Sequence, residues 1–160
     1  MMAQMARDIK QKSEKKNSQV ENKKISMNTE LSELNYKIKG AFYEVYKQLG
    51  PGLLEKVYEV ALERELTIRG LRVERQAPVS IRYKGEEIAS EMRLDMLVED
   101  KVIVELKSVE SGLQPIHFKQ LRTYLRLMDK PCGWLVNFDE EDICDGIRPV
   151  TNYLYGYIRK

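Results

Sequence analysis

The sequence contains little cysteine, little histidine and no long apolar run. Its 160 residues include two cysteines, Cys132 and Cys144, and one histidine, which is too few for a disulfide scaffold or a cysteine-based zinc site. No segment approaches the ~20 consecutive apolar residues of a membrane-spanning helix, and the first residues lack the apolar core of a signal peptide. These absences predict a cytoplasmic protein with no membrane partner.

The sequence also lacks a clear excess of one charge. It has 27 Lys and Arg against 25 Asp and Glu, a net charge of +2. Residues 1–27 carry seven basic and three acidic residues, so the remaining 133 residues carry a net charge of −2. The electrostatics of this larger part give no argument of their own for a nucleic-acid partner.

Residues 1–27 are poor in large apolar side chains and rich in Lys, Gln, Ser and Asn. Such a segment buries too little surface to offset its ordering entropy, so we expect a disordered or loosely helical basic tail. It could be an arm that contacts phosphates, a solvated tail, or a stretch upstream of a true start at Met27. Residues 28–160 are long enough for one domain with a buried core.

Hydrophobic spacing predicts two helices in the first half of that domain. Apolar residues recur at intervals of three and four from about residue 28 to Leu49, where Gly50-Pro51-Gly52 interrupts them. A second helix is predicted from about Leu53 to Arg69, followed by Gly70 as a suitable C-terminal residue.

The hydrophobic period then changes to two, which predicts strands. Pro78 marks an edge or bulged strand, and Lys84-Gly85 marks a hairpin turn. The last ten residues could form a short strand or helix packed on the core. The order of elements indicates a mixed α/β (α+β) fold. The other predicted elements are strands over about 93–98, 102–107 and 132–138 and a helix over about 115–129.

Two charges lie on one face of the apolar strand over residues 102–107. Side chains alternate along a strand, so Glu105 and Lys107 point to the same side. Asp95 lies among apolar residues of the preceding strand. Charges in such surroundings are costly to bury unless they are paired or bound to a metal.

The turn between these strands decides whether the carboxylates meet. A two-residue turn would put Asp95 on the wrong face. A three-residue turn over residues 99–101 places Asp95 opposite Glu105 and Arg93 opposite Lys107, and it keeps the apolar residues paired. Facing Cβ atoms are then ~4.5–5.5 Å apart, close enough for two carboxylates to share one hard cation. The alternative is a solvated ion-pair cluster of the same four side chains.

Two helical groups are candidates to join these charges. His117, Gln120 and Tyr124 share one face of the helix predicted over residues 115–129, and Glu55 and Tyr58 lie near the start of the second helix. His117 could instead be an ordinary surface histidine, and Glu55 could simply complement the helix dipole.

Three separated motifs resemble those of the PD-(D/E)XK nuclease superfamily and, within it, the GxxExxY proteins, a small prokaryotic branch. The resemblance spans about residues 31–150. The motifs are Gly52-x-x-Glu55-x-x-Tyr58, Asp95 with Glu105-x-Lys107, and Gln120-x-x-x-Tyr124.

The resemblance implies a restriction-endonuclease-like core, which is a mixed central sheet flanked by helices with the site on one sheet face. It implies Asp95, Glu105 and Lys107 as catalytic residues, with Lys107 serving the attacking water and the phosphate. The implied ligands of Mg²⁺ or Mn²⁺ are Glu55, Asp95 and Glu105. The resemblance implies Gln120 and Tyr124 as supporting or nucleic-acid-binding residues. We expect Tyr58, His117 and Arg93 in the same supporting or nucleic-acid-binding role.

This chemistry is coherent, because carboxylate oxygens suit Mg²⁺ or Mn²⁺ and a lysine supplies positive charge to the transition state of phosphodiester hydrolysis. We therefore expect a metal-dependent nuclease, a hydrolase acting on DNA rather than RNA. A homodimer would suit an enzyme that addresses two strands. The alternatives are hydrolysis of another phosphoester and a catalytically silent module of the same fold that binds a protein or nucleic acid.

Overall fold

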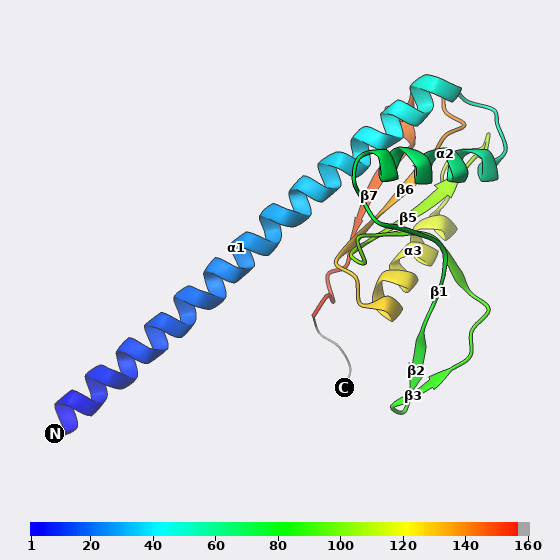
Figure 1. Cartoon of the computed structure of the whole chain (residues 1–160). Coiled ribbons are helices and arrows are strands. Elements are labelled where there is room, and N and C mark those ends of the chain that lie inside the picture. The colour runs from blue at the N-terminus through cyan, green and yellow to red at the C-terminus, as the bar shows by residue number, and fades with distance from the viewer. Residues whose placement is uncertain (157–160) are drawn as a thin grey trace. The chain divides into compact units, whose positions relative to one another are not determined.

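The structure, a computed structural model, describes residues 1–156 (Figure 1). Two compact units make up the chain: residues 1–37, and a second unit that starts at Ile38. Helix α1 begins at Met2 and ends at Leu49, whereas the sequence pattern predicts a start near residue 28. The earlier start agrees with the absence of glycine and proline before Gly40, because these two residues disfavour helices most. The division into a tail of residues 1–27 and a domain of residues 28–160 stays a prediction.

The end of α1 and the helix α2 (Glu55–Ile68) agree with the sequence prediction to within about two residues. The two helices are separated by a turn in which Gly50 and Gly52 have φ angles of 66° and 91°. Residues other than glycine rarely adopt such angles. The Gly50-Pro51-Gly52 segment therefore stops α1 and redirects the chain into α2.

One mixed sheet of five strands, in the order β1-β4-β5-β6-β7, forms the centre of the second unit. Its neighbouring strands are antiparallel, except that β5 and β6 are parallel. The predicted mixed α+β fold is confirmed. The strands of the sheet are β1 (Val73–Pro78), β4 (Arg93–Val98), β5 (Val102–Lys107), β6 (Cys132–Asn137) and β7 (Ile147–Thr151), and a separate hairpin is formed by β2 (Ile81–Tyr83) and β3 (Glu86–Ile88).

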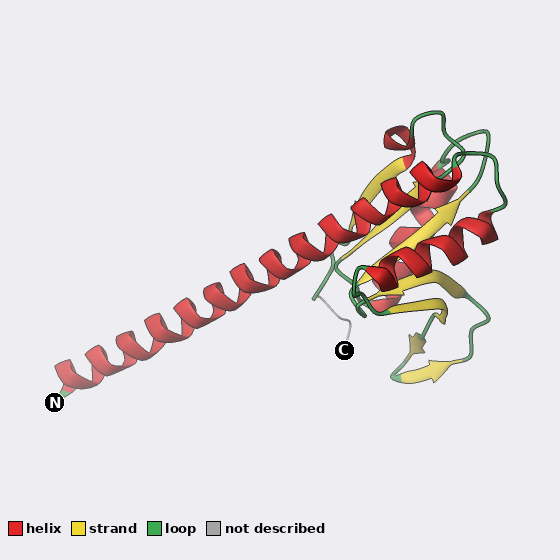
Figure 2. Ribbon diagram, turned by 45° about the horizontal axis from the view of Figure 1, so that its top comes forward, coloured by secondary structure: helices red, strands yellow, loops and turns green. Residues whose placement is uncertain are grey.

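Helices cover both faces of this sheet (Figures 1 and 2). The C-terminal part of α1 and α2 lie on one face, where the ring centroids of Phe42 and Trp134 are 5.9 Å apart. Helix α3 (Pro115–Met128) lies on the other face, where Leu121 packs beside Gly133. Strand alternation puts Glu105 and Lys107 on the α3 face, so the candidate site lies under α3.

The sequence pattern does not indicate β7, because Pro149 interrupts a short segment. Proline lacks a backbone donor, and the strand is tolerated because β7 lies at the edge of the sheet. A packed strand or helix at the C-terminus is wrong for the described part, since residues 153–156 form a turn and the exposed fraction of Tyr153 is 88%. Residues 157–160, the rest of that prediction, lie outside the described residues.

Among residues 1–156, no helix combines the length and the apolar character that a membrane crossing requires.

Candidate active site

The register of β4 and β5 brings Asp95 to Glu105. Met96 pairs with Val104, and Val98 with Val102, as the three-residue turn predicts. In that turn Glu99 and Asp100 have φ angles of 52° and 54°. The predicted register is confirmed.

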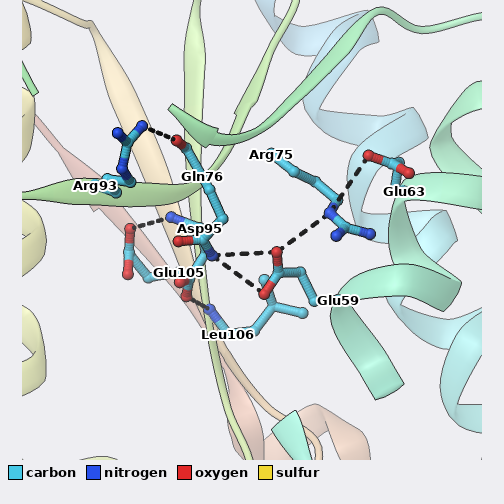
Figure 3. A network of polar contacts seen from close by, with 8 residues as sticks. All are labelled: Glu59, Glu63, Arg75, Gln76, Arg93, Asp95, Glu105 and Leu106. Atoms are coloured by element: carbon cyan, nitrogen blue, oxygen red, sulfur yellow. Dashed lines mark hydrogen bonds and ion pairs between the residues drawn. The ribbon is translucent and has the colours of Figure 1, made fainter. Parts of the chain in front are cut away.

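The backbone pairing of β4 with β5 stops at Met96 and Val104. At the next position, the side chains of Asp95 and Glu105 accept hydrogen bonds from backbone amides of the opposite strand (Figure 3). The backbone N–H of Asp95 donates to Oε1 of Glu105 at 3.1 Å, and the backbone N–H of Leu106 donates to Oδ2 of Asp95 at 2.9 Å. Each carboxylate thus commits one oxygen to an amide of the opposite strand. The two carboxyl groups also interact with each other, and a side-chain hydrogen bond between Asp95 and Glu105 contributes to the raised pKa of Glu105.

Glu105 is a buried carboxyl group beside another carboxylate. Only 4% of the residue is exposed. Burial, and then the negative charge of Asp95, raise the pKa of Glu105 to about 9, although the charge of Lys107 acts in the opposite direction. At neutral pH, Glu105 therefore carries a proton when no cation is bound. A cation would favour the ionised pair, so the donor set and its electrostatics fit a metal ion.

A solvated ion-pair cluster does not describe this arrangement. Glu105 is buried, and Nη1 of Arg93 donates to the backbone oxygen of Gln76 at 3.1 Å. Among the ion pairs of residues 1–156, none joins Arg93 or Lys107 to Asp95 or Glu105.

Glu55 approaches the same charges from the first position of α2. Burial raises the pKa of Glu55, the charge of Lys107 lowers it and the charge of Asp95 raises it again. The three groups therefore lie within electrostatic reach of one another. No three His, Cys, Asp or Glu side chains of the described chain stand close enough to hold a metal ion. Glu55, Asp95 and Glu105 are thus neighbours that do not form one coordination sphere in this conformation.

Helix α3 presents the predicted Gln120–Tyr124 pair to the site. Nε2 of Gln120 donates to the hydroxyl oxygen of Tyr124 at 2.9 Å. Burial, and then the charge of Glu105, raise the pKa of Tyr124, so its phenol stays protonated. Because the oxygen already accepts from Gln120, the phenol proton is directed away from that residue and is available to another acceptor.

His117 caps the start of α3. Its Nδ1 accepts a hydrogen bond from the backbone N–H of Gln114 at 2.9 Å, as part of a capping box. Burial, and then the charge of Lys107, lower the pKa of His117. An imidazole that accepts at Nδ1 is neutral and carries its proton on Nε2. His117 therefore caps α3, and its imidazole lies within electrostatic reach of Lys107.

Tyr58 lies on the other face of the sheet and is completely buried. Its ring stacks on Phe138 with centroids 4.5 Å apart, and its hydroxyl donates to the backbone oxygen of Gly50 at 2.5 Å. A fully buried side chain cannot contact a nucleic acid. Of its two predicted roles, this environment favours support.

A polar network beside Asp95 involves residues that no sequence motif marks (Figure 3). Glu59, of which 7% is exposed, accepts from Nε2 of Gln76 at 3.1 Å and pairs with Nε of Arg75 at 3.3 Å. Gln76 lies in β1 between the pairs that β1 makes with β4, and its φ angle is 51°. The network fastens α2 to β1 next to the carboxylates. The four-residue spacing from Glu55 to Glu59 is a visible signal, whereas nothing in the sequence marks the left-handed Gln76.

A family model of the PD-(D/E)XK nuclease superfamily matches residues 32–150. The chain belongs to the PD-(D/E)XK nuclease superfamily. The matched range contains α2, α3 and the sheet apart from the last residue of β7. The mixed sheet flanked by helices is consistent with the restriction-endonuclease-like fold of this superfamily. No curated protein and no solved structure matches the chain significantly.

Proposed function

We propose that the protein is a metal-dependent nuclease that hydrolyses phosphodiester bonds of DNA in the cytoplasm. The observation that carries the proposal is the pairing of the buried Glu105 with the half-buried Asp95, with Lys107 two residues further along β5. Membership of the PD-(D/E)XK superfamily supports nuclease-type chemistry on a nucleic acid. The motif residues Gly52, Glu55 and Tyr58 at the start of α2 support the assignment of this protein to the GxxExxY branch.

Mg²⁺ or Mn²⁺ is the metal that this donor set fits best. Asp95 and Glu105 would hold the ion through oxygens, with Glu55 contributing from α2, and hard oxygen ligands favour these ions over zinc. When bound, the ion would polarise the scissile phosphate and lower the pKa of a water molecule.

Lys107 and Tyr124 supply the charge and the proton donors around the reacting phosphate. The ammonium of Lys107 orients the attacking water and faces the negative charge that develops on the phosphate. Tyr124, protonated and held by Gln120, directs its phenol proton toward the carboxylates or the phosphate. Arg93, exposed two residues before Asp95, binds a neighbouring phosphate of the nucleic acid.

One observation favours a second candidate function, a catalytically silent module that binds a nucleic acid or a protein. Asp95 and Glu105 already bond backbone amides of opposite strands. That use stabilises the end of the β4–β5 pair without a metal, so the two carboxyl groups would retain a structural role in a protein that cleaves nothing.

Cleavage assays test the proposed function and separate it from the silent module. The substrates are plasmid DNA, single-stranded DNA and RNA, each with Mg²⁺, with Mn²⁺ and with EDTA. We expect cleavage of DNA with either ion and none in EDTA. Cleavage of RNA alone would contradict the DNA assignment, and binding of DNA without cleavage under any condition would support the silent module. The mass of the active species in solution tests the proposed homodimer.

A further inference from the structure

Two hydroxyl groups bond both backbone polar groups of Leu53, two residues before Glu55. The backbone N–H of Leu53 donates to the hydroxyl oxygen of Tyr58 at 3.1 Å, and the hydroxyl of Ser108 donates to the backbone oxygen of Leu53 at 2.5 Å. Tyr58 in turn donates to the backbone oxygen of Gly50 at 2.5 Å. Since Ser108 directly follows Lys107, the turn before Glu55 is bonded to the end of β5.

The ring of Tyr58 is itself fixed relative to Lys107. It is fully buried and stacks on Phe138 at an interplanar angle of 7°. The backbone N–H of Phe138 donates to the backbone oxygen of Lys107 at 2.9 Å. Tyr58 therefore connects the turn to the strand end that carries Lys107 by a path separate from Ser108.

Two other backbone hydrogen bonds lie at the ends of this turn. The N–H of Gly50 donates to the backbone oxygen of Tyr46, and the N–H of Val57 donates to that of Leu54. Gly50 and Gly52 have positive φ angles. Because glycine has no side chain, these two positions can adopt many backbone conformations in the unfolded chain, and that freedom is lost when the turn forms.

Leu54, the N-cap residue of α2, makes no side-chain capping bond. The bonds from Tyr58 and Ser108 therefore help to fix the start of α2, and with it the backbone of Glu55, whereas the Glu59 contacts hold α2 one turn further along.

We propose that Tyr58 and Ser108, called here the hydroxyl clamp, are positioning residues that hold Glu55 toward Lys107 and Asp95 for metal binding. The inference rests on the proposed function, in which Glu55 is a metal ligand. It also explains the G-x-x-E-x-x-Y pattern physically. Gly52 permits the turn, Tyr58 stabilises the turn by hydrogen bonds, and Glu55 is the metal ligand that the turn positions.

The test uses the full chain and the variants Tyr58→Phe and Ser108→Ala, each of which removes one hydroxyl. Tyr46→Phe is the matched control, because the Tyr46 hydroxyl donates to the backbone oxygens of Glu140 and Glu141 at 2.5 and 2.8 Å. The control thus removes the same type of bond from a different loop. Amide hydrogen exchange of the metal-free protein and calorimetric titration with Mg²⁺ are measured for every variant.

We expect the amides of residues 53–57 to exchange about tenfold faster in both clamp variants than in the wild type. We also expect both variants to bind Mg²⁺ about tenfold more weakly, because loss of a residue that supports a metal ligand commonly lowers metal affinity by this amount. Tyr46→Phe should change neither quantity. In a Glu55→Gln background the clamp variants should cause no further loss of Mg²⁺ affinity, because the clamp acts through Glu55.

Unchanged exchange at residues 53–57 in both clamp variants would overturn the clamp. Faster exchange with wild-type Mg²⁺ affinity would make the hydroxyls purely structural and would overturn their role in positioning Glu55. Equal Mg²⁺ affinity of the wild type and Glu55→Gln would remove Glu55 from the metal site. That result is a failure of the proposed function, and the exchange data distinguish it from a failure of the clamp.

Discussion

Replacing Lys107 by alanine is expected to abolish Mg²⁺-dependent cleavage while the protein stays folded. Lys107 lies at the end of β5, and its charge acts on Glu55, Glu105 and His117. Loss of one preorganised group that stabilises transition-state charge typically costs about 10²–10³ in rate. The fold should survive, because the bond from Phe138 to this position uses the backbone oxygen, which alanine retains.

Initial cleavage rates and thermal unfolding measure the two halves of this prediction. Lys47→Ala removes an exposed lysine from α1 and controls for the loss of one positive charge. Cleavage by Lys107→Ala within tenfold of the wild-type rate would exclude Lys107 from the chemistry. A large fall in melting temperature would assign it a structural role instead.

Glu105→Gln is expected to abolish Mg²⁺ binding and to change how stability depends on pH. In the folded, metal-free wild type the pKa of Glu105 is about 9, against 4.5 for an unperturbed glutamate. Between these two values the unfolded chain releases a proton that the folded chain keeps, so a rise in pH favours unfolding. The contribution of Glu105 is therefore most favourable below about pH 4.5 and is lost progressively as the pH rises toward 9. Glutamine cannot titrate and lacks this dependence.

Urea unfolding in EDTA at pH 5, 7 and 9 tests the sign of this effect. The free energy of unfolding of the wild type should fall relative to Glu105→Gln as the pH rises. Glu99→Gln is the matched control, since hydrogen bonds from Arg72 lower the pKa of Glu99 below 4.5 and this group is ionised in both the folded and the unfolded state from pH 5 to pH 9. Its free energy of unfolding should therefore run parallel to that of the wild type over this range, apart from the contribution of Glu105 that both proteins share. Parallel curves for the wild type and Glu105→Gln would contradict the buried, protonated Glu105. Added Mg²⁺ should stabilise the wild type and not this variant.

The meeting of Asp95 and Glu105 could be predicted from the sequence because it follows from packing. Only the three-residue turn pairs Met96 with Val104 and Val98 with Val102, and a shift by one residue would expose that whole apolar set. The pairing of Gln120 with Tyr124 followed in the same way from helical spacing. Local periodicity determines both contacts.

The surroundings of the site depend on contacts that periodicity does not encode. The left-handed Gln76 is held by Glu59 of α2, and its residue type gives no hint of a positive φ angle. Tyr58 lies in the same helix as Glu55, but its hydroxyl bonds the backbone of the turn that precedes this helix, at Leu53 and Gly50. The bond between Gln76 and Glu59 requires two assembled elements, and the bonds of Tyr58 require the preceding turn to fold back on α2. The sequence pattern therefore identifies Tyr58 but not its role.

Calorimetric titration with Mg²⁺ tests the central claim, a metal site built on Asp95 and Glu105, most directly. The wild type is compared with Asp95→Ala and with Asp95→Asn, which keeps an oxygen for the bond from Leu106. Each protein is titrated with and without an oligonucleotide whose phosphodiester analogue cannot be cleaved. We expect saturable binding by the wild type, strengthened by the oligonucleotide, and none by either variant. Binding by the variants as tight as wild type, or no binding by the wild type with the oligonucleotide present, would contradict the metal site.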